Sequence, residues 1–334
     1  MATVLLTGAS GFLGVHTVQH LLDAGHDVRA LVRTPRRLRD HLRPLGVDDA
    51  RLDVIEGDMT SVPAVREAVA GCDAVIHAAA TYSFRRSDAR TMEHDNVTGT
   101  RAVLEAAAEA GCRNAVHVSS TVALVRPGGA PVDERSPLGP GMGPYSRSKV
   151  ASERVARGMQ DAGAPVTVVN PGGILGPHDP YLGESNDTVV QILKGRIPAW
   201  PKGRLQYVDV RDCAAALVAA AGQEPGRRFI VPGETVTSLH PLLRTLTGRR
   251  LPVATLPAGR VAPAALPGYL TGWSMLPGTV EGVRIVGCGN QVDDSASSVA
   301  LGLTARPLRE SLADTVRWLV SAGHVSRKEA GKLA

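Results

Sequence analysis

The chain has 334 residues, of which 43% are hydrophobic and 21% charged, and its formal net charge is +5. This is the composition of a globular protein with room for one large domain or two smaller ones. The basic residues form no stripe and no known reading module, so we expect no nucleic-acid partner. Gly and Pro interrupt every long apolar stretch, so we expect no transmembrane helix and no membrane partner.

The four cysteines are isolated from one another and from histidines in metal-ligand spacing. Their isolation argues against a metal centre and a disulfide framework, and it fits a reducing compartment. The first residues, MATVLLTGAS, enter a short apolar run without a charged leader, unlike a secretory signal. We therefore expect a cytoplasmic protein without a metal.

Short apolar runs alternate with helix-length segments through the first half of the chain. The runs are continuous and rich in Val, Leu and Ile, which is typical of parallel strands buried on both faces. They cover residues 4–7, 28–32, 52–56, 74–77, 115–119 and 166–169. Helical periodicity covers residues 12–24, 62–70, 94–110 and 145–161. The pattern predicts an α/β fold with a doubly wound parallel sheet that binds ligands at the carboxyl ends of its strands.

The pattern changes after about residue 171, where Pro and Gly become frequent. A strand and an Ala-rich helix follow within residues 204–232, and the remaining third carries helical stretches that end with an amphipathic segment. We expect the sheet domain to cover residues 1–171 and 204–232. A smaller, mostly C-terminal substrate-binding lobe would cover residues 172–203 and 233–334.

The stretch TGASGFLG (7–14) joins the first predicted strand to the first predicted helix. Its glycines, Gly8, Gly11 and Gly14, have G-x-x-G-x-x-G spacing. Glycine permits a tight turn and a close approach of the backbone, and the helix N-terminus offers N–H groups to a pyrophosphate. A purely structural turn is the alternative interpretation. Its place in a βαβ unit favours a dinucleotide-binding Rossmann domain.

The second predicted strand ends at Arg33, with Arg36 and Arg37 close behind and no acidic residue at its tip. A carboxylate at this tip would bind the ribose 2′-hydroxyl of NAD, whereas a guanidinium suits the 2′-phosphate of NADP. Solvated surface arginines are the alternative interpretation. We expect NADP (NADPH) as the favoured cofactor and keep NAD open.

Tyr145 and Lys149 lie four residues apart in a predicted helix and therefore share a face. An ammonium beside a phenol lowers the pKa of the phenol, so Tyr145 can exchange a proton with a carbonyl–alcohol pair while a nicotinamide carries the hydride. A second hydroxyl is expected at the end of the fifth predicted strand, from Ser119, Ser120 or Thr121. Ordinary strand-end hydroxyl residues are the alternative interpretation of this trio.

The motifs TGASGFLG, HAAA (77–80), VSST (118–121) and YSRSK (145–149) occur in an order that resembles the extended short-chain dehydrogenase/reductase family, also called the NAD-dependent epimerase/dehydratase family. The resemblance covers residues 2–232. It implies a catalytic set of Tyr145, Lys149 and Thr121, with Ser120 as the alternative hydroxyl. It also implies cofactor contacts from Gly8, Ser10, Gly11, Phe12, Leu13, Gly14, Arg33, Asp58, Met59, His77, Ala78, Ala79, Ala80, Tyr145, Lys149, Pro171, Gly172 and Ile174.

The stretch TVVNPGGILGP (167–177) distinguishes between branches of this family. It lacks the arginine that nucleotide-sugar epimerases and dehydratases carry there, and it resembles reductases of dihydroflavonols, cinnamoyl thioesters or steroid-like ketones. We expect an NADPH-dependent oxidoreductase that reduces a ketone or aldehyde of a fairly apolar small molecule, with Tyr145 as proton donor. An apolar pocket could be lined by Trp200, Trp273, Met275 and Leu276, which could equally be core residues.

Two alternative functions stay open. One is an NAD-dependent nucleotide-sugar epimerase or dehydratase with tightly held NAD. The other is a non-catalytic nucleotide-sensing protein on the same fold. A homodimer is possible in each case.

Overall fold

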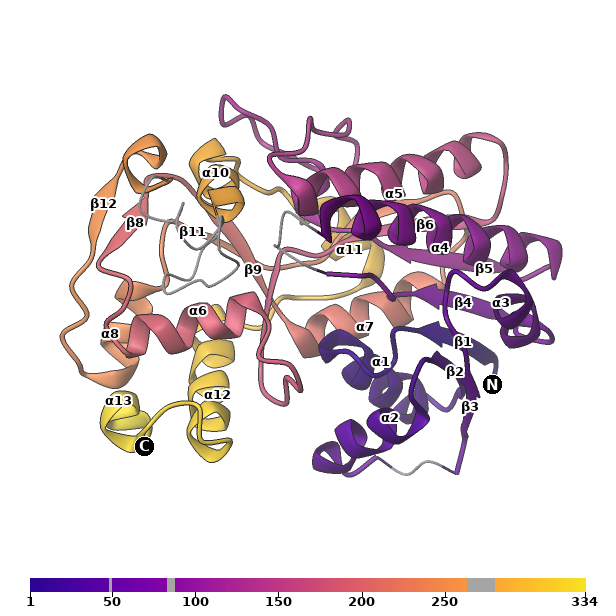
Figure 1. The fold of residues 1–334 in the computed structure, drawn as a ribbon, viewed down its shortest axis with the longest axis horizontal. Helices are drawn as coiled ribbons and strands as arrows, with labels where there is room; N and C mark the ends of the chain where they lie inside the picture. Colours follow the sequence, from indigo (N-terminus) through magenta and orange to yellow (C-terminus); the bar gives the residue numbers. More distant parts are fainter. Residues whose placement is uncertain (48–49, 83–87, 263–279) are drawn as a thin grey trace.

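A seven-stranded parallel sheet organises the larger part of the protein (Figure 1). The computed structural model describes residues 1–47, 50–82, 88–262 and 280–334. In sheet order the strands are β10 (Arg228–Ile230), β6 (Val166–Asn170), β5 (Asn114–Val118), β4 (Ala74–His77), β1 (Thr3–Thr7), β2 (Asp27–Val32) and β3 (Leu52–Glu56). All neighbouring strands pair in parallel. The order reverses at β1, so the ligand crevice is expected beside the carboxyl ends of β1 and β4.

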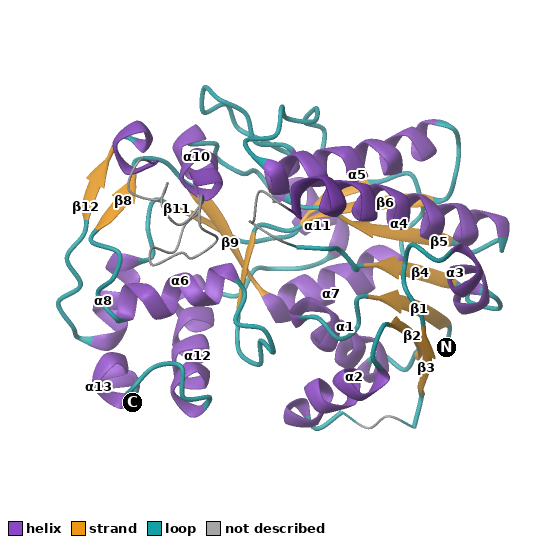
Figure 2. Ribbon diagram, viewed as in Figure 1, coloured by secondary structure: helices purple, strands orange, loops and turns teal. Residues whose placement is uncertain are grey.

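Helices cover both faces of this sheet (Figures 1 and 2). One face packs against α3 (Val62–Val69), α4 (Ala89–Glu109) and α5 (Pro144–Asp161). The opposite face packs against α1 (Phe12–Asp23), α2 (Pro35–Leu42) and α7 (Val210–Ala221). Short 3₁₀ turns, η1 (Arg43–Leu45) and η3 (Thr121–Ala123), follow α2 and β5. The predicted doubly wound α/β fold is therefore confirmed.

A smaller lobe lies beside the sheet, on the left in Figure 1. It contains a three-stranded sheet of β7 (Gly173–Leu175), β9 (Leu205–Asp209) and β11 (Glu234–Val236), and a pair of β8 (Ala199–Pro201) and β12 (Ala254–Leu256). Its helices include α6 (Glu184–Leu193), α8 (His240–Thr247), α10 (Val280–Cys288), α12 (Leu308–Ser321), α13 (Arg327–Ala330) and the turn η4 (Gly331–Leu333). The helix α11 (Ser295–Leu301) packs near α7. A separate hydrophobic core, with Leu193, Leu243 and Leu312 at its centre, holds the lobe together.

The observed elements differ from the sequence-based expectations in three places. Strand β9 pairs with β7 and β11 rather than with the central sheet. Strand β5 ends at Val118, one residue before the predicted end, and η3 follows. The helix α2 was not expected from the sequence, because its segment is strongly charged and has few apolar residues. Only Leu38 and Leu42 of this helix are buried. The proposed domain boundaries stay a prediction.

The parallel register brings four strand ends to one edge. Thr7 lies beside His77, which lies beside His117 in the next strand. The segments that follow these strands therefore meet at that edge, together with the segment that follows β6. Among the described helices, none is long and apolar enough to cross a membrane.

Two helical glycines give opposite expectations for stability. An added Cβ at Gly14 would clash with the Gly8 carbonyl oxygen and lie 2.7 Å from the Ala9 backbone. We expect Gly14→Ala to lower the free energy of unfolding by about 1–3 kcal/mol, because the crowded turn must shift. Gly158 is an exposed residue of α5 with open space around it. Gly158→Ala should raise stability by about 0.5–1 kcal/mol through helix propensity. Denaturant unfolding of both variants measures the difference, and equal effects would contradict the packing argument.

Candidate active site

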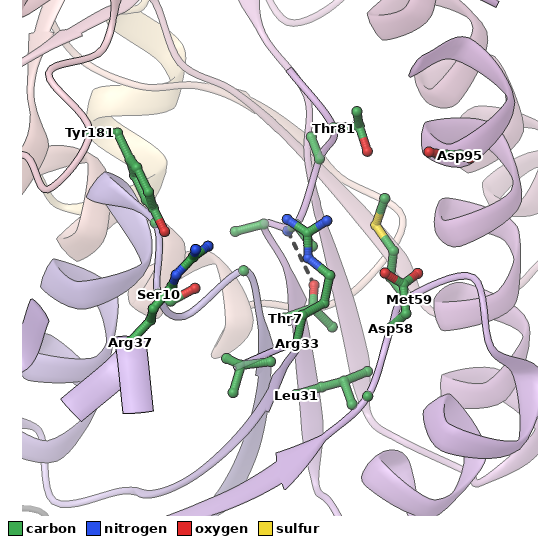
Figure 3. A pocket seen from close by; sticks show the side chains of 17 residues that line it. Thr7, Ser10, Leu31, Arg33, Arg37, Asp58, Met59, Thr81, Asp95 and Tyr181 are labelled. Atoms are coloured by element: carbon green, nitrogen blue, oxygen red, sulfur yellow. Dashed lines mark hydrogen bonds between the residues drawn. The ribbon is translucent and has the colours of Figure 1, made fainter. Parts of the chain in front are cut away.

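A cavity of about 340 Å³ lies at the carboxyl ends of β1, β2, β3 and β4. Figure 3 shows its lining side chains. The lining includes nine of the predicted cofactor residues: Gly8, Ser10, Gly11, Arg33, Asp58, Met59, Ala78, Ala79 and Ala80. The structure thus brings together half of the predicted cofactor residues, from the segments that follow four strands, β1, β2, β3 and β4.

The glycine turn has the geometry of a phosphate cradle. Gly8 has a φ of +76°, and a Cβ there would lie 2.6 Å from the backbone nitrogen of Ala79. Gly11 is the N-cap of α1 and has no side chain to bind the first-turn N–H groups. These N–H groups are therefore available to an anion at the positive end of the helix dipole. The turn fits the pyrophosphate of a dinucleotide.

Two arginines line the adenosine end of this cavity. Arg33 and Arg37 are exposed, and neither makes a salt bridge within the described part of the chain. Arg36 instead pairs with Asp40 at 3.8 Å on the outside of α2. Burial alone would raise the pKa of Asp58, but hydrogen bonds from Thr60 and the charge of Arg33 hold that pKa below its ordinary value. The site therefore offers two guanidinium groups without a salt bridge among the described residues at the tip of β2.

A second cavity, of about 430 Å³, adjoins the first at Ala78. It is lined by seven further predicted residues: Phe12, Leu13, Tyr145, Lys149, Pro171, Gly172 and Ile174. Most of its wall is apolar, with Trp200, Val283 and Ile285 contributed by β8 and α10. Trp200 thus lies where the sequence suggested, whereas Trp273, Met275 and Leu276 fall outside the described residues.

Two predicted cofactor residues line neither cavity. Gly14 packs beneath the glycine turn. His77 is buried in the sheet, where its ring nitrogens lie 2.8 Å from the Thr7 hydroxyl and 3.3 Å from the Thr100 hydroxyl. Burial lowers the pKa of His77 to about 3, and the charge of Lys149 adds to this effect. His77 therefore stays neutral, and its ring links the end of β1 to α4 through Thr7 and Thr100.

Tyr145 and Lys149 occupy successive turns at the start of α5. Burial lowers the pKa of Lys149 to about 8, against the opposing effect of Glu153, and its Nζ donates to the Val118 carbonyl oxygen at 3.3 Å. Burial raises the pKa of Tyr145, with further contributions from Glu184 and Glu281. From the sequence we expected a lowered pKa for Tyr145. Burial instead outweighs the lowering effect of the Ser120 hydrogen bond, so the pKa is raised. The phenol is held protonated, the form of a proton donor.

The three candidate hydroxyl residues point to different surroundings. Ser119 also lines the second cavity, but its hydroxyl donates to the buried Glu153 carboxylate at 2.5 Å. Ser120 lines the cavity, and its hydroxyl forms a hydrogen bond with Tyr145. Thr121 starts the turn η3 and is not among the described lining residues. Ser120 is thus the hydroxyl that the fold places beside the phenol.

The buried carboxylate of Glu153 was missed by the sequence reasoning. It is fully buried and accepts hydrogen bonds from Ser119, Asn170 and Arg157. Asn170 in turn donates to the Ser120 carbonyl oxygen at 3.1 Å. The sequence did contain one signal for Glu153, its spacing from Lys149. The two residues lie one helical turn apart on the same face of the helix. This network fixes the backbone on which Ser120 sits.

Glu281 was also missed, and no local sequence pattern could have indicated it. Its carboxylate accepts from the backbone N–H groups of Tyr145 and Ser146 at 3.1 and 2.6 Å, and from the Ser146 hydroxyl at 2.6 Å. It is 2% exposed and lies against Gly143, where any side chain would displace it. A residue of α10 therefore caps the helix that carries Tyr145.

Comparison with known proteins agrees with this geometry. The profile of the NAD dependent epimerase/dehydratase family matches residues 4–231. Sterol demethylase protein B of Methylococcus capsulatus is 31% identical over 97% of this chain and 100% of the relative. Cinnamoyl-CoA reductase 1 of Arabidopsis thaliana is 30% identical over 97% of this chain and 91% of the relative.

The fold is also shared with a solved dTDP-glucose 4,6-dehydratase, DesIV of Streptomyces venezuelae. That structure has a TM-score of 0.76 and 24% identity, and the match covers 98% of this chain and 99% of the other. The chain belongs to the NAD-dependent epimerase/dehydratase family, the extended short-chain dehydrogenase/reductases. It is an NAD(P)-dependent oxidoreductase of this type, as the sequence predicted.

The cap at the start of α5 generates a stability prediction. Glu281→Ala leaves the N–H groups of Tyr145 and Ser146 without their carboxylate, so we expect the free energy of unfolding to fall by about 1–3 kcal/mol. Glu310 is an exposed acid in the first turn of α12, and Glu310→Gln should change stability by less than about 0.5 kcal/mol. Denaturant unfolding compares the two variants. A Glu281→Ala protein as stable as the wild type would show that the cap is not required.

Proposed function

We propose that the protein is an NADPH-dependent reductase of ketones or aldehydes on fairly apolar small molecules. The observation that carries this proposal is the position of Ser120, Tyr145 and Lys149, in a mostly apolar cavity that adjoins a dinucleotide cradle. The names of the two relatives refer to a sterol and a cinnamoyl thioester, both largely apolar skeletons. Their likeness supports an apolar substrate here.

The residues present fit a bound dinucleotide, whose reduced nicotinamide ring would supply the hydride. Gly8 and the start of α1 would hold the pyrophosphate, and Arg33 and Arg37 the ribose phosphate. Pro171, Gly172 and Ile174 would form part of the wall beside the nicotinamide.

The chain's own groups would then act on the substrate carbonyl. Ser120 would donate a hydrogen bond to the carbonyl oxygen, which stabilises negative charge developing there. Tyr145, held protonated by burial, would give its phenolic proton to the same oxygen. The Lys149 ammonium would stabilise the phenolate left behind.

The catalytic assignment predicts distinct effects for neighbouring hydroxyl residues. Tyr145→Phe removes the proton donor and should reduce kcat by about 10²–10⁴-fold. Ser120→Ala should reduce kcat by about 10²–10³-fold, whereas Thr121→Val should stay within about tenfold of wild type, because Thr121 is not among the cavity residues. NADPH oxidation with a panel of ketones of graded size measures these rates. Full turnover by Tyr145→Phe would contradict the mechanism, and a larger loss in Thr121→Val than in Ser120→Ala would reverse the hydroxyl assignment.

The preference for NADPH is tested at the tip of β2. Arg33→Ala should raise the Kd for NADPH by about 10- to 100-fold, because a charge-assisted hydrogen bond to the phosphate is lost. The Kd for NADH should not change, since NADH lacks that phosphate. Arg36→Ala is the matched control, because Arg36 points to Asp40 outside the cavity. Calorimetric titration of both cofactors measures the Kd values. Equal losses for NADPH and NADH, or copurification of tightly held NAD, would favour the epimerase or dehydratase alternative.

A further inference from the structure

Among the residues that the structure describes, four fully buried carboxylates have at least three hydrogen-bond donors each. They are Glu153, Asp179, Asp209 and Glu281, and their donors are backbone N–H groups, amides, hydroxyls or arginines. Such pairing is the usual condition for burying a charge. The carboxylates inside the protein are thus satisfied from within.

Glu184 departs from this pattern. It is the first residue of α6, is half-buried, and lines the apolar cavity that holds Tyr145. Its carboxylate accepts one hydrogen bond, from the Tyr82 hydroxyl at 2.8 Å, and makes no salt bridge among the described residues. Most of its hydrogen-bonding capacity is therefore left for a group that enters the cavity.

The position of Glu184 relates it to the reacting centre. The Tyr82 ring stands edge-on to the Tyr145 ring, with centroids 4.8 Å apart and an interplanar angle of 75°. Glu184 is hydrogen-bonded to the hydroxyl of that same Tyr82 ring. A substrate whose carbonyl meets Ser120 and Tyr145 would thus bring its neighbouring atoms toward this carboxylate.

The electrostatic surroundings of Glu184 favour a ligand whose hydrogen-bond donor is uncharged. Burial raises the pKa of Glu184 to about 7, and the charges of Glu281 and Asp187 add to this, while the Tyr82 hydrogen bond opposes it. Both the ionised and the neutral carboxyl group can bind a hydroxyl, whereas an ammonium group needs the ionised form. The Lys149 ammonium also shares the cavity and would repel a second cation.

We propose that Glu184 is a specificity-determining residue that binds a hydroxyl group of the substrate. The substrate class is then a ketone or aldehyde with a largely apolar skeleton and a hydroxyl group set apart from the carbonyl. This inference rests on the proposed carbonyl reduction. It adds a polar recognition point to a cavity that is otherwise mostly apolar.

The experiment compares matched ketones on the NADPH-loaded enzyme. Benzylacetone is the parent, and its derivatives carry a hydroxyl on the benzylic carbon, a hydroxyl in the para position, or a para-aminomethyl group. We expect wild type to have a lower KM for at least one hydroxylated ketone than for benzylacetone. Glu184→Leu should reduce kcat/KM for that ketone by about 10- to 100-fold more than it reduces kcat/KM for benzylacetone. Glu184→Gln, which keeps an acceptor for Tyr82, should retain part of the preference.

Two controls separate recognition from support of the fold. Asp187→Asn removes a charge from the same turn of α6, where Asp187 bonds to Gln191 outside the cavity, and it should keep the preference. Tyr82→Phe should also keep it, because the carboxylate and not the phenol binds the hydroxyl. Equal losses for parent and hydroxylated ketones in both Glu184 variants would overturn the proposal.

Recognition can also be tested without turnover. For this purpose, the dissociation constants of the same ketones are measured with the NADPH complex of the Tyr145→Phe variant. A hydroxyl preference there supports Glu184 recognition even where carbonyl reduction fails. The absence of any hydroxyl preference in both KM and Kd overturns the Glu184 proposal, and Tyr145-dependent reduction of benzylacetone would leave the proposed function standing. Preference for the aminomethyl ketone would overturn the assignment to a hydroxyl.

Discussion

The contact of the Glu281 carboxylate with the N-terminus of α5 is the interaction on which the geometry of the candidate site depends. The first N–H groups of a helix have no partner within it, and Gly143 supplies no capping side chain. An acid 136 residues further along the chain meets this need at Tyr145. Tyr145 is therefore positioned by a contact between two parts of the chain that are distant in sequence. The next residues of α10, Gly282 and Val283, line the substrate cavity, so one helix forms both the cap and a cavity wall.

A second constraint comes from the buried side of the same helix, α5. Tyr145, Lys149 and Glu153 follow one another at intervals of one turn, so a single stripe of α5 runs from the cavity into the core. Glu153 partly offsets the burial of the Lys149 ammonium. The same carboxylate accepts a hydrogen bond from the Ser119 hydroxyl, while the Ser120 hydroxyl is hydrogen-bonded with Tyr145. The network thus gives the two adjacent serines different partners.

Features set by local spacing could be predicted from the sequence, whereas features set by distant contacts could not. The glycine turn, the tip of β2 and the Tyr145–Lys149 spacing each lie within one short segment, and the structure places them as expected around two adjoining cavities. The identity of the hydroxyl depended on the last residue of β5. That strand ends one position earlier than its composition suggests, because the chain turns into η3 at Thr121. The role of Glu281 had no local signal.

Glu184 shows why substrate recognition is the least predictable part of such a chain. An acid at the first position of a helix is ordinary in sequence, because the helix dipole favours negative charge there. Only the fold shows that this acid faces a cavity with a single tyrosine donor, whereas the fully buried carboxylates of the described residues each accept at least three hydrogen bonds. The cavity wall comes from β8, α6 and α10, which lie outside the glycine turn and the Tyr–Lys segment. Changes in those elements can therefore alter what is bound while the strand ends that perform the chemistry stay in place.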